Sequence, residues 1–104
     1  MDIAALQLEI DAFAEARDWR QFHNPKNLAA ALSVEASELL EIFQWLTPEQ
    51  GEVVMQNHVS AEAVRDEVAD VMVYLLRLTD ILGIDLEAAV RAKMLKNAVK
   101  HPAP

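Results

Sequence analysis

The chain has 104 residues, of which 53% are hydrophobic, and it carries a formal net charge of −8 and no cysteine. This length suits one small domain, and we expect residues 1–104 to form it. The acidic balance argues against a nucleic-acid-binding protein, because such proteins need clustered Lys and Arg. The lack of cysteine excludes disulfides and thiolate metal sites. The longest apolar run, residues 68–78, is interrupted by Asp70 and Arg77, so we expect no membrane span and a cytoplasmic protein.

Helix-forming residues dominate the chain, which contains only two glycines and four prolines, and this composition favours an all-α fold over any sheet. The first helix is predicted from about Asp2 to Asp18, because apolar residues recur there at helical spacing. A short polar connection, Arg20 to His23, follows it. We expect the helices to pack as an antiparallel four-helix core.

Capping signals mark the starts of the remaining helices. Asn24-Pro25 predicts a long second helix reaching about Trp45, because an N-cap followed by proline suits a first turn. The other predicted starts and stops are Thr47-Pro48 for a short third segment, Ser60 and Gly83 for the ends of a long fourth helix, and Asp85 for a last helix over Leu86 to about Lys100.

Two pairs of acidic residues stand out within these helices. Glu35 and Glu38 lie three residues apart on the second predicted helix, and Glu67 and Asp70 repeat that spacing on the fourth. Residues three apart share a helix face, so antiparallel packing would bring the four carboxylates together. Such oxygen ligands suit Mg²⁺ or Mn²⁺. The spacing by itself is equally typical of a solvated acidic stripe.

Longer motifs surround these acids. Residues 35–45, EASELLEIFQW, and residues 65–75, RDEVADVMVYL, together resemble the E-x-x-E and E-x-x-D signature of MazG-like all-α nucleotide pyrophosphohydrolases. The segments RDWRQFH at 17–23 and KMLKNAVKHP at 93–102 are similar to those of the small dCTP pyrophosphatase branch. Val34 and His101 depart from the usual pattern of that branch, so the resemblance assigns no role to either residue.

The resemblance implies an activity and a set of site residues. The activity is the Mg²⁺-dependent hydrolysis of a nucleoside triphosphate, dCTP or a modified relative of it, to the monophosphate and pyrophosphate. The four acids would hold the metal, and Glu38 or Glu41 would act as the base, unless a metal-bound hydroxide does so. The substrate-binding residues would be Trp19, His23, Trp45, Tyr74, Lys93, Asn97 and Lys100.

The residue types leave other roles open for this last set. Aromatic side chains at helix ends often close a core instead of stacking on a base. Lysines near a helix C-terminus often only compensate the helix dipole, although Lys93, Asn97 and Lys100 share one face and could contact phosphates.

The apolar content predicts self-association. Long helices with apolar residues on more than one side, such as Leu75, Leu76 and Leu78, cannot bury every face within so short a chain. We therefore expect a homo-oligomer, in which a tetramer is favoured and a dimer is the alternative. A non-catalytic helical oligomerisation module is the main competing function, and a nucleic-acid-binding bundle is disfavoured by the charge.

Overall fold

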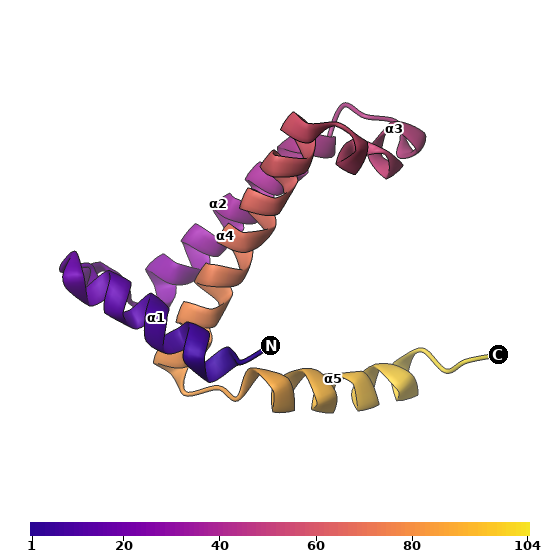
Figure 1. The fold of residues 1–104 in the computed structure, drawn as a ribbon. Coiled ribbons are helices and arrows are strands. Elements are labelled where there is room, and N and C mark those ends of the chain that lie inside the picture. Colours follow the sequence, from indigo (N-terminus) through magenta and orange to yellow (C-terminus); the bar gives the residue numbers. More distant parts are fainter.

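The computed structural model describes residues 1–104 and is helical throughout, with no strand (Figure 1). The all-α prediction is therefore confirmed. In chain order, the elements are α1 (Ile3–Ala16), η1 (Arg20–Phe22), α2 (Pro25–Phe43), α3 (Pro48–Glu52), η2 (Val54–Gln56), α4 (His58–Leu82) and α5 (Leu86–Lys100).

Most helix ends lie where the capping residues predict them. The Asp2 side chain accepts a hydrogen bond from the backbone N–H of Ala5 at 3.0 Å, and Asn24 caps α2 with Pro25 in the first turn. Thr47 forms a reciprocal capping box with Gln50 at the start of α3. Each cap satisfies backbone donors that the first turn leaves without a helical partner.

The start of α4 differs from the prediction. Asn57, and not Ser60, is the N-cap, because its side chain accepts from the backbone N–H groups of Val59 and Ser60 at 2.9 and 3.2 Å. The Ser60 hydroxyl instead donates to the carbonyl of Val54, which ties η2 to the first turn of α4. The other end of α4 agrees with expectation, since Gly83 has a φ of 66° and ends the helix in the left-handed conformation.

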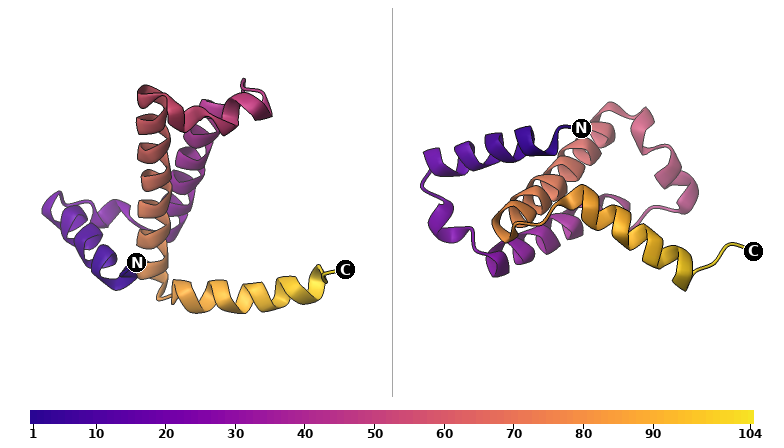
Figure 2. Two further views of the ribbon diagram at one scale, coloured as in Figure 1. Left: turned by 45° about the vertical axis from the view of Figure 1, so that its right-hand side comes forward. Right: turned by 90° about the horizontal axis from the view of Figure 1, so that it is seen from below.

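The centre of the molecule is the antiparallel pair formed by α2 and α4, which run side by side for most of their length (Figures 1 and 2). Helix α1 crosses the C-terminal half of α4, and the Gln7 amide donates to the carbonyl of Leu76 at 3.2 Å. The buried apolar residues are few and lie where these helices meet: Ala14, Leu28, Ala61 and Leu76.

Helix α5 leads away from the α2–α4 pair and ends far from it in each view (Figures 1 and 2). Within one chain it therefore does not close a fourth side of the expected core. The radius of gyration is 16.5 Å, whereas a compact chain of this length has about 13 Å. Only 6 of 104 residues are buried. No helix has the length and apolar character needed to cross a membrane.

Candidate metal and nucleotide site

Three of the four predicted metal ligands come together between α2 and α4. One carboxylate oxygen from each of Glu35, Glu38 and Glu67 lies within 4.8 Å of the other two. The two residues on α2 are three apart, so they project from one face, and the antiparallel neighbour brings Glu67 opposite them. The predicted convergence of carboxylates from both helices is thus present for these three residues.

The electrostatics of this acidic cluster, Glu35, Glu38 and Glu67, are unfavourable without a cation. One oxygen of Glu35 and one of Glu67 are buried and have no hydrogen-bond partner. Burial is the main cause that raises the pKa of Glu35 to about 7, and the neighbouring Glu38 and Asp70 carboxylates add to it. Burial and the charge of Glu38 also raise the pKa of Glu67. Carboxylates that lie close together and are partly buried repel one another, so they favour either protonation of one of them or a bound cation.

The two remaining acids of the prediction lie outside the acidic cluster. Asp70 is one helical turn beyond Glu67, is exposed, and acts on the cluster through its charge. Glu41 is also exposed and lies one turn beyond Glu38. Both carboxylates are therefore open to solvent at the edge of the cluster, where a ligand or a water molecule would reach them.

An aromatic cleft begins at Asp70. It has a volume of about 510 Å³ and lies between α1, the following turn and α4. Its walls include Phe13, Trp19 and Tyr74, and the Phe13 and Trp19 rings meet edge to face at 5.6 Å. A large part of Trp19, 41%, is exposed. A partly open cleft with aromatic walls next to a carboxylate suits a ligand with a planar ring and a negatively charged tail held by a cation.

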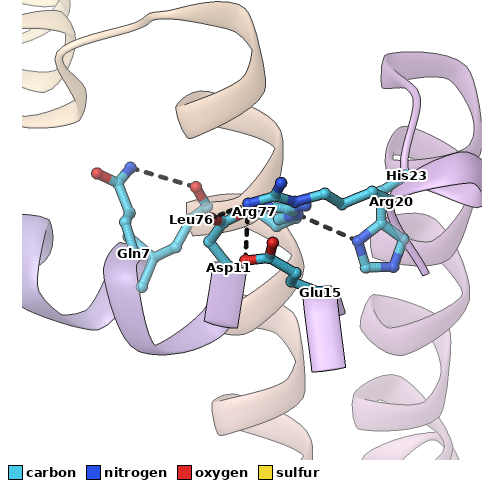
Figure 3. A network of polar contacts seen from close by, with 7 residues as sticks. All are labelled: Gln7, Asp11, Glu15, Arg20, His23, Leu76 and Arg77. Carbon is cyan, nitrogen blue, oxygen red and sulfur yellow. Dashed lines mark hydrogen bonds and ion pairs between the residues drawn. The ribbon is translucent and has the colours of Figure 1, made fainter. Parts of the chain in front are cut away.

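His23 lies beside this cleft, with its ring 6.1 Å from that of Trp19. Its Nδ1 accepts a hydrogen bond from Nε of Arg77 at 3.1 Å, and Arg77 also donates to Asp11 at 2.7 Å (Figure 3). Asp11 in turn pairs with Arg20 at 2.6 Å. Neither Asp11 nor Arg77 is among the site residues predicted from the sequence. The available signal was a charged residue in an otherwise apolar helix face, which Arg77 provides on α4.

Four predicted substrate-binding residues are not brought to the cleft within one chain. Trp45 follows the C-terminal end of α2 and is 87% exposed, whereas His23 precedes the other end of this 19-residue helix, about 28 Å away by the helical rise. The other three lie on α5, which leads away from the α2–α4 pair (Figure 1): Lys93, Asn97 and Lys100.

The arrangement can bind a divalent cation and, beside it, a planar group. Carboxylate oxygens are the usual ligands of small hard cations, and the partnerless oxygens of Glu35 and Glu67 are free to serve as such. The aromatic cleft can stack a base. Two of the chain's arginines, Arg20 and Arg77, line a hollow together with His23, and both are already paired with Asp11.

Known proteins resemble this chain in sequence and in fold. Residues 30–104 match the MazG-like family. The chain is 43% identical over 104 residues to dCTP pyrophosphatase 1 of Homo sapiens and 42% identical over 102 residues to that of Rattus norvegicus. These matches cover 98% and 97% of this chain but only 58% of each relative, so the chain spans less than two thirds of their length.

Among solved structures, a pyrophosphatase from Archaeoglobus fulgidus has the same fold. It is 38% identical, with a TM-score of 0.90, over 99% of this chain and 94% of the archaeal one. The family predicted from the acidic motifs is confirmed, as is the resemblance to the dCTP pyrophosphatase branch. The chain belongs to the MazG-like family.

Proposed function

We propose that the protein hydrolyses a nucleoside triphosphate, dCTP or a modified dCTP-like nucleotide, to the monophosphate and pyrophosphate with the help of Mg²⁺. The observation that carries this proposal is the acidic cluster, in which two buried carboxylate oxygens have no partner. The relatives of this chain that are named dCTP pyrophosphatase, and the structural neighbour named pyrophosphatase, support the substrate class.

The residues fit a divalent cation. Glu35, Glu38 and Glu67 would hold it, and Asp70, which also lines the aromatic cleft, would complete the ligand set. All four of these metal ligands are carboxylates, which favours Mg²⁺ over softer metals and allows Mn²⁺ as a substitute. When bound, such an ion neutralises the triphosphate and lowers the pKa of a water ligand.

The proposed reaction is attack by water on the α-phosphorus. A P–O bond forms between the water oxygen and that phosphorus, the bond to the bridging α–β oxygen breaks, and pyrophosphate carries this oxygen away. One proton of the water passes to a carboxylate, for which Glu38 and Glu41 are the two candidates. Glu38 lies within the acidic cluster, whereas Glu41 is exposed one turn away.

The base of the nucleotide would occupy the aromatic cleft. Trp19 and Tyr74 would contact its faces, and the adjacent His23 would contact its edge. This placement puts the triphosphate toward Asp70, because that residue belongs to both the cleft and the charge environment of the cluster. Stacking on an exposed aromatic contributes about 1–3 kcal/mol per base.

A homo-oligomer, with a tetramer favoured and a dimer as the alternative, would supply what one chain lacks. Lys93, Asn97 and Lys100 belong to α5, the helix that leads away from the α2–α4 pair (Figure 1), and Trp45 is exposed. We propose that they reach the phosphates and base held by a neighbouring copy. The apolar residues left open along α5, which include Val90, Met94, Leu95 and Val99, supply a surface for such packing.

The test is a panel of natural and modified triphosphates incubated with the protein and Mg²⁺, with products separated by chromatography. Release of pyrophosphate together with the monophosphate supports the proposal, and release of inorganic phosphate overturns it. If the protein turns over no triphosphate and its melting temperature does not change with divalent cations, it is instead the non-catalytic oligomerisation module. We expect no nucleic-acid partner, and we propose the cytoplasm as the location because its nucleotide pool would provide the substrate.

A further inference from the structure

Arg77 is a buried cation in the C-terminal half of α4. It is only 4% exposed, whereas most residues of this chain are not buried. Its guanidinium has two partners, Nδ1 of His23 at 3.1 Å and Oδ1 of Asp11 at 2.7 Å (Figure 3). A buried guanidinium is costly unless it is paired and its donors are used. Both partners of this buried arginine are side chains of the same chain, one imidazole and one carboxylate.

The hydrogen bond to His23 fixes where that imidazole carries its proton. Arginine remains protonated in proteins, so Nε of Arg77 must be the donor and Nδ1 of His23 the acceptor. A ring that accepts at Nδ1 has its single proton on Nε2. Burial first, and the charge of Arg77 second, lower the pKa of His23, which keeps the ring neutral.

The groups around this pair hold Arg77 in place. Hydrogen bonds from Arg20 and Arg77 lower the pKa of Asp11, so its carboxylate stays charged and anchors both guanidinium groups. Glu15 lies 3.3 Å from Arg20. Asp80 on α4 lines the hollow that is also lined by Asp11, Arg20, His23 and Arg77. The local carboxylates therefore balance the two cations, and none of them accepts from His23.

We propose that Arg77 is a positioning residue that locks His23 as the Nε2–H tautomer and so presents a hydrogen-bond donor to an acceptor atom on the edge of the substrate base. This inference rests on the proposed function, because it assumes that a nucleotide base occupies the cleft lined by Trp19. His23 adjoins that aromatic wall, with the two rings 6.1 Å apart. A neutral donor distinguishes an edge that offers a carbonyl or unprotonated ring nitrogen from one that offers only N–H groups.

The decisive measurement is the tautomer itself. Imidazole ¹⁵N chemical shifts of the full-length protein should show His23 protonated at Nε2 and unprotonated at Nδ1 at pH 7. Arg77→Met keeps the apolar stem of the side chain and loses the two donors in use, Nε and Nη1. In this variant the His23 signals should shift to those of a mixture of tautomers. Arg77→Lys should restore part of the wild-type pattern, because its ammonium can donate to Nδ1 but lacks the planar fork.

Kinetics test whether the locked donor meets substrate. Arg77→Met should raise KM for the preferred triphosphate about tenfold, as expected for loss of one hydrogen bond, and should change kcat less. Inhibition by inorganic tripolyphosphate should stay unchanged if the acceptor is on the base; weaker inhibition would place it on the phosphates and overturn the proposal. Arg20→Met is the matched control, because it removes the exposed partner of Asp11 without touching His23.

Asp11→Asn is the variant to use if Arg77→Met fails to fold. It keeps the shape of the network and removes the charge of Asp11, so it should give a tautomer shift intermediate between those of the wild type and Arg77→Met. Wild-type His23 protonated at Nδ1, or an Arg77→Met protein with unaltered tautomer and KM, would overturn the inference. The spectra need no substrate, so they distinguish failure of the lock from failure of the proposed function. A wild-type protein that hydrolyses no triphosphate would overturn the substrate role along with that function.

Discussion

Replacing Glu35 by Gln should stabilise the metal-free protein at alkaline pH. Glu35 has a buried oxygen without a partner, and its pKa is raised to about 7, first by burial and then by Glu38 and Asp70. Glutamine resembles the protonated carboxyl in shape and carries no charge. The substitution therefore removes the repulsion that the ionised cluster suffers when no cation is bound.

The sign and size follow from proton binding. Between pH 4.5, the ordinary pKa of Glu35, and about 7, its pKa in the fold, the native state binds more protons than the unfolded state. Stability contributed by this group is complete below pH 4.5 and is lost as the pH rises through 7. The full shift corresponds to about 3 kcal/mol, and partial solvent exposure reduces it to roughly 1–2 kcal/mol.

Thermal unfolding of EDTA-treated protein across pH 5 to 8.5 measures this effect. In a domain of this size each kcal/mol moves Tm by about 4–8 °C, so Glu35→Gln should melt higher than wild type at pH 8 and nearly with it at pH 5. Glu62→Gln is the control, since Glu62 is exposed on α4 and outside the cluster. A wild-type Tm that rises from pH 5 to pH 8, or equal Tm values for the two proteins at pH 8, would refute the reasoning.

The same site supports four further predictions. Mg²⁺ should raise the Tm of the wild-type protein and EDTA should reverse this, because a ligand bound only by the native state stabilises it; a Tm indifferent to Mg²⁺ in scanning fluorimetry would contradict the metal site. Glu38→Gln and Glu67→Gln should each lower kcat/KM on the order of 100-fold or more, and a steady-state assay giving wild-type values for both would remove them from it. Trp19→Ala should raise KM by roughly tenfold through lost stacking, whereas an unaltered KM would make this residue part of the core. Light scattering should find the active species to be a homo-oligomer, and a fully active monomer at micromolar concentration would disprove that.

Local sequence was enough to predict the helices and their ends. Asp2, Asn24 and Thr47 act on backbone groups within three residues of themselves, so their capping role can be read without knowing the fold. The exception is the start of α4, where Asn57 caps the helix and the hydroxyl of the predicted cap, Ser60, donates to the carbonyl of Val54 in η2. The spacing of the acids likewise determined which side chains share a helix face.

Only the tertiary structure decided what those faces meet. Glu67 joins Glu35 and Glu38 because α2 and α4 pack antiparallel in one register, while Asp70, with the same local spacing, lies at the cleft. The pair formed by Arg77 and Asp11 joins residues 66 apart in sequence. Charge and hydrophobicity patterns report the periodicity of one helix, and they carry no information on the rotation and offset of a second helix packed against it.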